Sequence, residues 1–345
     1  RGLVTGAAVA QALSQQTRLP LADLEAEPPD PALSRGMDPR GLLRLGILPW
    51  KRQHGRLVIA VDGPGARARL LDLRPALEVS ADFAIADRRT IEDAILALHG
   101  PALATAARDR CPEPFSCRGW TGGRRLLPVL GLALMAAALL APVSLFLGLL
   151  SWLALVNACT MALRAVALVE SFRAGQSAPR RAPSDAPLPV ISLLIPLFRE
   201  DATLRQLIAA LETSDYPRER LDVIFILEAD DVATPIALAQ SRLPPWARVL
   251  TAPPDTLKTK PRAMNLALNF CRGDIVGIYD AEDRPEPDQL RRVAEHLAAA
   301  PPDVACVQGY LDFYNPRQNW LARCFAVEYA IWFRVLLRGV QRLRM

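Results

Sequence analysis

Acidic side chains gather directly after three apolar segments of the chain. The segments span residues 190–197, 222–228 and 274–280. The groups that follow or end them are Arg199-Glu200-Asp201, Glu228-Ala229-Asp230-Asp231 and Asp280-Ala281-Glu282-Asp283. If the groups meet in space, their repulsion needs compensation. A Mg²⁺ or Mn²⁺ ion that also carries substrate phosphates supplies it, and the remaining carboxylates could accept hydrogen bonds from ribose hydroxyls or a base.

Helix capping is the competing role for some of these acids. Asp201 and Asp231 each precede a segment of helical spacing, where an aspartate commonly accepts hydrogen bonds from the first turn. Both roles stay open for these two residues. The third group differs, since Pro285 follows it and places it in a turn. We therefore predict metal binding by Asp280, Glu282 and Asp283.

Two lysines stand between the second and third acidic groups. The chain has only three lysines, and Lys258 and Lys260 are two of them. Positive charge facing acidic loops suits a diphosphate, which favours a phosphate-binding role for Lys260. A solvated helix entry is the alternative.

Strands and helices alternate in this part of the chain. Apolar runs predict strands at 190–197, 222–228, 274–280 and 304–308, and helical spacing predicts helices at 201–213, 262–271 and 287–299. Continuous apolar strands alternating with helices indicate a mostly parallel sheet covered on both faces. Ligands of such sheets bind beyond the carboxyl ends of the strands, where the acidic groups lie.

A long uncharged stretch precedes the α/β part. Residues 126–163 contain no charged side chain, and one helix of that length would be about 57 Å long, nearly twice the ~30 Å hydrocarbon core of a membrane. We predict a hairpin of two transmembrane helices at about 126–143 and 147–169. Arginines flank both ends, which places both flanks in the cytoplasm. A buried hairpin of a soluble protein is the alternative.

Aromatic residues cluster between positions 310 and 333. They could stack on an acceptor sugar, or they could form a belt where a helix meets the membrane interface. Both interpretations stay open, with the interface slightly favoured.

The composition excludes several classes of protein. The chain is 51% hydrophobic and 22% charged, unlike a disordered chain. Its formal charge of +5 comes without an arginine-rich run interleaved with aromatics, so we predict no nucleic-acid partner. Its six cysteines form no CxxC pair, which indicates neither a disulfide framework nor a zinc site and fits a cytoplasmic setting.

The α/β part resembles the first portion of a family 2 glycosyltransferase, close to the bacterial cellulose-synthase-like branch. The similarity covers about residues 189–338, and the order and spacing of its pieces carry it. They are Pro196-Leu197-Phe198-Arg199-Glu200, Leu227-Glu228-Ala229-Asp230-Asp231, Lys260-Pro261-Arg262-Ala263-Met264-Asn265, Tyr279-Asp280-Ala281-Glu282-Asp283-Arg284-Pro285, Gln308-Gly309 and the segment from Asn319-Trp320 to Trp332-Phe333.

This resemblance implies a GT-A fold, a Rossmann-like α/β domain that is C-terminally incomplete here, and a nucleotide-sugar donor such as a UDP-sugar. Metal ligands are expected from the Asp-x-Asp element, which reads Asp280-Ala281-Glu282-Asp283, so the second acid is either Glu282 or Asp283. The residues expected to bind the donor or acceptor are Phe198, Glu200, Glu228, Asp230, Asp231, Lys260, Asn265 and Gln308.

The implied reaction is an inverting displacement at the anomeric carbon. The metal neutralises the leaving diphosphate, and a carboxylate base removes the proton of the acceptor hydroxyl. In the family that base belongs to a Thr-Glu-Asp element, which is absent before Met345. We therefore expect no catalytic base within these residues and no sugar transfer by this chain alone.

Residues 1–100 resemble the N-terminal domain of type II secretion ATPases. Leu19-Pro20-Leu21, Leu45-Gly46-Ile47-Leu48-Pro49 and Leu57-Val58-Ile59-Ala60 carry the similarity. Some relatives bind cyclic di-GMP through a repeated motif that contains Arg-Leu-Gly. Arg44-Leu45-Gly46 matches one copy, while an earlier copy would precede Arg1, so we favour a regulatory or docking module. A match to the dinucleotide pattern at residues 63–68 is rejected, because Pro64 stiffens the turn.

The predicted organisation is a small α+β module at 1–100, a linker at 101–125, two transmembrane helices at 126–169, a linker at 170–188 and the transferase domain at 189–345. The predicted function is a multi-pass enzyme of the bacterial inner membrane that adds sugars to a growing glycan. One alternative is a membrane-anchored sensor that binds a nucleotide or nucleotide-sugar without catalysis. Another is a phosphotransferase with Asp280 as nucleophile.

Overall fold

The computed structural model describes residues 4–117, 126–173, 187–198, 204–240, 243–244, 246–255 and 257–342. The chain divides into two compact units. One comprises Arg1–Pro112 with Ser184–Ala294, and the other comprises Glu113–Pro183 with Glu295–Met345. The first unit contains both the N-terminal module and the α/β sheet with its acidic loops.

The N-terminal module is built on a three-stranded sheet of β1 (Ile47–Gln53), β2 (Arg56–Val61) and β3 (Ala81–Ile85). β1 pairs with β2 antiparallel, and β2 pairs with β3 parallel. Only β2 follows from the apolar pattern of the sequence, because β1 contains Pro49 and three polar or charged residues at its end. The helices are α1 (Gly6–Thr17), α2 (Pro39–Leu45), α3 (Pro64–Leu73), α4 (Leu77–Ser80) and α5 (Arg88–Arg108), with a 3₁₀ turn at Pro31–Leu33.

Helix α5 corrects one predicted boundary. It continues through Pro101 to Arg108, eight residues into the segment expected to be a linker. A proline inside a helix removes one backbone hydrogen bond. The burial of Leu103, Ala104 and Ala107 beyond it offsets this loss, so packing extends the helix past the residue that suggested its end.

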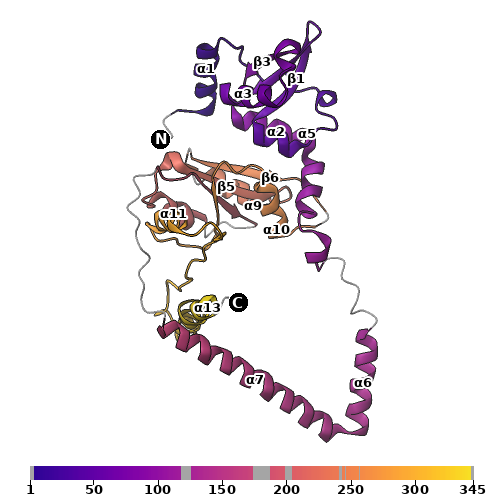
Figure 1. The fold of residues 1–345 in the computed structure, drawn as a ribbon, viewed down its shortest axis with the longest axis vertical. Coiled ribbons are helices and arrows are strands. Elements are labelled where there is room, and N and C mark those ends of the chain that lie inside the picture. The colour runs from indigo at the N-terminus through magenta and orange to yellow at the C-terminus, as the bar shows by residue number, and fades with distance from the viewer. Residues whose placement is uncertain are drawn as a thin grey trace. The chain divides into compact units, whose positions relative to one another are not determined.

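The α/β part contains four parallel strands in the order β6-β5-β4-β7, as the alternating pattern predicts. The strands are β4 (Ile191–Pro196), β5 (Leu221–Glu228), β6 (Ala247–Ala252) and β7 (Ile275–Ile278). In Figure 1, β5 and β6 lie side by side with α9 and α10 close by. The predicted strand at 304–308 is wrong: these residues form an exposed irregular segment.

Side chains alternate between the two faces of this sheet. Val223, Phe225 and Leu227 pack on the face that carries α8 (Leu204–Glu212) and α11 (Gln289–Ala299). Ile224 and Ile226 pack on the other face with α10 (Lys260–Ala267) and with residues of α5. A 3₁₀ turn at Arg218–Arg220 precedes β5, and helix α9 (Ala233–Gln240) follows β5. The sheet is therefore covered on both faces, as its apolar strands require.

The second unit contains the apolar helices. Helix α6 (Leu126–Leu140) and helix α7 (Pro142–Arg173) meet at a sharp corner at Ala141 (Figure 1). The break falls at Ala141, slightly earlier than the gap expected at 144–146, and α7 starts directly at Pro142, since proline fits the first position of a helix. α7 is long and apolar enough to cross a membrane, whereas α6 is shorter.

The second unit ends in a further helical segment. α12 (Trp320–Ala330), a π-helical turn at Ile331–Leu336 and α13 (Leu337–Arg342) follow one another. α13 packs against α7 so closely that a side chain at Gly339 would overlap the backbone of Ala167. In the aromatic cluster, the ring of Phe313 lies 4.8 Å from that of Tyr329, edge to face.

Candidate functional site

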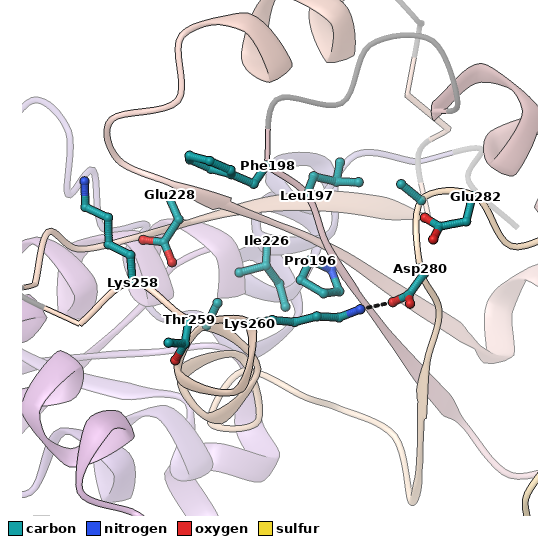
Figure 2. A pocket seen from close by; sticks show the side chains of 12 residues that line it. Pro196, Leu197, Phe198, Ile226, Glu228, Lys258, Thr259, Lys260, Asp280 and Glu282 are labelled. Atoms are coloured by element: carbon teal, nitrogen blue, oxygen red, sulfur yellow. Dashed lines mark hydrogen bonds and ion pairs between the residues drawn. The ribbon is translucent and has the colours of Figure 1, made fainter. Parts of the chain in front are cut away.

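A pocket of about 310 Å³ lies at the carboxyl ends of β4 and β5, together with the loop that follows β7. The strand order places β5 on one side of β4 and β7 on the other. The chain reverses its winding direction there, which is where open α/β sheets bind ligands. Figure 2 shows the lining residues, which are Pro196, Leu197, Phe198, Ile226, Glu228, Lys258, Thr259, Lys260, Ala263, Asp280, Ala281 and Glu282.

Lys260 and Asp280 form an ion pair across this pocket. The Lys260 ammonium reaches from the first residue of α10 to Oδ1 of Asp280 (Figure 2). Their side chains are 45% and 43% exposed, so both charges remain accessible to a ligand. The arrangement offers a cation and a carboxylate to the same small volume.

The three acids of the turn after β7 make different contacts, and metal binding by each of them stays a prediction. The Asp283 carboxylate accepts a hydrogen bond from the Asp280 backbone N–H at 2.8 Å, and the Asp283 N–H donates to the Asp280 carbonyl at 3.1 Å. Asp283 thus holds the turn closed, while Asp280 and Glu282 line the pocket. Burial raises the pKa of Asp283, and the nearby charges of Asp280 and Glu282 raise it further.

Glu228 enters the pocket from the last position of β5. Arg262 donates from Nη2 to Glu228 Oε2 at 2.5 Å, and the Arg262 side chain is only 2% exposed. Burial raises the pKa of Glu228, and the charge of Arg262 counteracts this effect. The guanidinium therefore fixes the position of the carboxylate and favours its charged form.

The other two acids after β5 have different partners. Asp230 pairs with Lys258, a pocket-lining residue, at 2.6 Å. Asp231 accepts hydrogen bonds from Ala233 N, Thr234 N and Thr234 Oγ1, the last at 2.6 Å. These are the contacts of a helix cap at the start of α9. A donor-binding role for Asp230 and Asp231 stays a prediction.

Two further candidates, Asn265 and Gln308, do not line the pocket. Asn265 donates from Nδ2 to the Ala107 carbonyl of α5 at 3.1 Å, and it does not line the pocket. Gln308 is exposed in the second unit, where its amide lies 3.4 Å from the Gly309 carbonyl. Glu200 lies outside the described residues, as do Arg199 and Asp201.

The carboxylates of the pocket could supply part of the ligands of a divalent cation. Asp280 and Glu282 present two carboxylates to one pocket, and Mg²⁺ is commonly held by one or two carboxylates together with substrate phosphates and water. Among the described residues, no group of three or more His, Cys, Asp and Glu side chains is arranged to hold a metal ion. A metal at this pocket would be held by these two carboxylates together with other oxygen atoms, such as those of a bound diphosphate or of water.

Sequence reasoning missed the role of Arg262 and the wall residue Thr259. The Arg262–Glu228 pair joins residues 34 positions apart, so no local pattern announces it. The local pattern is misleading: an arginine directly after a proline at a helix start is expected to be solvated, whereas Arg262 is buried. Such a residue needs a carboxylate partner within the fold.

Comparison with known proteins agrees with this architecture. Residues 192–344 match the family described as Glycosyl transferase family 2, and residues 17–105 match the MshEN domain. The chain therefore carries a family 2 glycosyltransferase domain preceded by an MshEN domain, which confirms both resemblances seen in the sequence.

Individual relatives extend the comparison. The beta-monoglucosyldiacylglycerol synthase of Synechocystis sp. is 28% identical over 51% of this chain, and the chain spans only 39% of that protein. A mannosyltransferase from Pyrobaculum calidifontis, solved with GDP-Man and Mn²⁺, is 26% identical over 49% of each chain, with a TM-score of 0.36. The N-terminal domain of XpsE is 23% identical over 27% of this chain and 66% of its own, with a TM-score of 0.24.

Proposed function

We propose that the protein is a membrane-bound glycosyltransferase that transfers a sugar from a nucleotide-sugar donor, with inversion and with help from Mg²⁺ or Mn²⁺. The observation that carries the proposal is the pocket at the switch point of the sheet. It brings Lys260, Asp280 and Glu282 to one side and Glu228 and Phe198 to the other, inside a domain of glycosyltransferase family 2.

Five residues of the pocket have assigned roles in this proposal. Lys260 would exchange its contact with Asp280 for the donor phosphates, because an ion pair that is nearly half exposed contributes little and is readily replaced. Asp280 and Glu282 would then hold the cation, which neutralises charge on the leaving diphosphate. Glu228, fixed through Oε2 by Arg262, would accept a hydrogen bond from the nucleoside, and Phe198 would supply an apolar surface beside it.

Binding of UDP in the presence of Mn²⁺, measured by titration calorimetry, tests the metal assignment. We expect Asp280→Asn and Glu282→Gln each to weaken binding at least tenfold, because each removes a charged metal ligand. Asp283→Asn is the matched control, since its carboxylate holds the turn and does not line the pocket. Metal-independent binding that survives both substitutions would contradict the proposal.

Transfer to an acceptor separates the enzyme from a binding-only sensor. A protein spanning the whole reading frame is incubated with radiolabelled UDP-glucose and UDP-N-acetylglucosamine in membranes. Glycan labelling that disappears in Asp280→Asn supports the transferase. A phosphoryl-aspartate trapped at Asp280, without glycan labelling, would identify a phosphotransferase instead.

The membrane assignment rests on α6 and α7. α7 has 32 residues, about 48 Å at 1.5 Å per residue, which exceeds the ~30 Å hydrocarbon core. None of its most apolar window is buried within the protein. We propose that α6 and α7 form a transmembrane hairpin with both flanks in the cytoplasm, in keeping with the arginines on either side.

Cysteine labelling tests this hairpin. Cys111 and Cys306 are exposed, precede and follow the apolar helices, and can each be kept as the single cysteine of a variant. In intact spheroplasts we expect neither to react with a membrane-impermeant maleimide, while both react after lysis. Labelling of one of them in intact cells would require an odd number of crossings between them.

A further inference from the structure

Helix α5 belongs to the N-terminal module but also packs on the transferase domain. Leu103 and Ala107 of α5 share one hydrophobic cluster with Leu266 and Phe270, which belong to α10 and the turn after it. Arg110 donates to the Asn265 carbonyl at 3.4 Å. The module therefore rests on α10, the helix whose first residue is Lys260.

Side by side with this apolar contact runs a chain of charged groups. Arg108, the last residue of α5, donates from Nη1 to Asp255 Oδ1 at 3.3 Å. The other oxygen of Asp255 lies 3.9 Å from Nη1 of Arg262. The side chains of Asp255 and Arg262 are 8% and 2% exposed, so these two interact with little solvent screening, whereas Arg108 is 31% exposed and also pairs with Asp109.

Arg262 connects this chain to the pocket. Its Nη1 donates to the Pro253 carbonyl at 3.0 Å and its Nη2 binds Glu228 at 2.5 Å. Its Nε has no hydrogen-bond partner among the described residues. A buried guanidinium in this position depends on the carboxylates on either side of it, so a change at Asp255 alters how firmly Arg262 holds Glu228.

The backbone of α5 also touches the loop that carries Asp255. A side chain at Gly100 would come within 3.2 Å of Pro253, whose carbonyl accepts from Arg262. A movement of α5 relative to the sheet would therefore shift both Pro253 and Asp255. Among the described residues, the Arg262 guanidinium contacts these two and Glu228.

We propose that Arg108 is a positioning residue for the donor pocket, acting through Asp255 and Arg262 on Glu228. The N-terminal module thereby forms part of the support of the pocket, and any ligand or partner that shifts α5 changes donor affinity. This inference rests on the proposed function, because its readout is binding of a nucleoside diphosphate. Arg108 itself does not line the pocket.

The test compares substitutions on one helix by titrating UDP with Mn²⁺ into the purified protein. Arg108→Ala is expected to raise the Kd about three- to tenfold, and Arg108→Lys to recover part of the loss. Arg89→Ala is the matched control: Arg89 also lies on α5 and donates to the Ala247 carbonyl at 3.1 Å, at the start of β6 and away from the pocket. It should leave the Kd unchanged, with a similar shift in melting temperature.

A double-mutant cycle on UDP affinity distinguishes an effect that acts through Glu228 from a general structural effect of Arg108. If Arg108 acts through Glu228, Arg108→Ala should add little to the loss caused by Glu228→Gln, whereas independent effects would multiply. Multiplying losses, or an Arg108→Ala variant that binds like the unaltered protein, would overturn the inference while leaving the proposed function intact. Absence of UDP binding by the unaltered protein would overturn both.

Discussion

The two ends of the transferase sheet hold charged residues in opposite ways. At the starting end, Arg248 binds Glu92 of α5, and its Nε lies 3.0 Å from Asp222 Oδ1. These three side chains are at most 8% exposed, and Ser192 donates to Asp222 at 2.7 Å. At the carboxyl end, Lys260 and Asp280 pair while nearly half exposed.

The difference separates buried charges that hold the fold from exposed charges that a ligand could reach. A buried charge whose partner is removed is left without water, which costs several kcal/mol. An exposed pair contributes little to stability because water and salt screen it. A ligand can therefore replace the partner of Lys260 or Asp280 cheaply, whereas no ligand can compete for Arg248.

The largest expected effect is on stability, at the buried end. Arg248→Ala should lower the free energy of unfolding by about 3–5 kcal/mol, since it leaves Asp222 buried without its guanidinium partner, while Glu92 keeps Arg88 and Arg272. Urea unfolding measures it. Arg40→Ala, which breaks a pair whose side chains are 60% and 55% exposed, should cost about 0–1 kcal/mol. Equal losses in both variants would remove the distinction.

The next effect is on binding, at the exposed end. Lys260→Ala should weaken UDP binding about tenfold or more, because a hydrogen bond to a charged group contributes roughly 1.5–3 kcal/mol. The unfolding free energy should change by less than about 1 kcal/mol. Lys51→Ala, in the N-terminal module, is the matched lysine control and should leave the affinity unchanged. A stability loss in Lys260→Ala that equals that of Arg248→Ala would make the two ends alike.

Asp231 sharpens the comparison, because it stands at the pocket end yet has the contacts of a structural residue. Asp231→Ala should lower stability by about 1 kcal/mol through loss of the α9 cap, with UDP affinity unchanged. Calorimetry and thermal unfolding of the same preparation measure both. A large loss of affinity with unchanged stability would instead make Asp231 a donor ligand.

The smallest effect is a pH dependence from Asp222. Burial alone would raise its pKa, but the charge of Arg248 and the Ser192 hydroxyl hold it below the ordinary value of 3.8. A carboxyl with a lower pKa in the folded protein stabilises it above the unfolded pKa, and this contribution disappears as the pH falls through the folded pKa. Unfolding free energy should therefore decrease below about pH 4, with a shallower slope in Asp222→Asn. Parallel slopes would contradict this assignment.

The sequence predicted the parts of the sheet whose burial is expressed as continuous apolar runs. β4 and β5 are such runs, and every residue of β5 is buried. β6 escaped prediction because Arg248 interrupts its apolar pattern, although the arginine is buried. The strand prediction at 304–308 failed for the opposite reason. The apolar residues Val304 and Val307 suggest a buried strand, but both are exposed.

The candidate site was also predicted only in part from the sequence. Lys260 and Asp280 could be picked out as candidates from their types and their places relative to the predicted strands. The support behind them could not, since the contacts of Arg262 and Arg108 depend on which distant segments fold together. Long-range pairing of charges is a property of the tertiary structure, and composition or periodicity does not report it.

The continuous helix through Pro101 has a practical meaning for anyone preparing the transferase on its own. Starting the polypeptide after α5 would remove Leu103 and Ala107 from the hydrophobic cluster that they share with Leu266 and Phe270. Exposed hydrophobic patches of this kind promote aggregation. A preparation that stays monomeric will need to retain α5 or to replace Leu266 and Phe270 with polar residues.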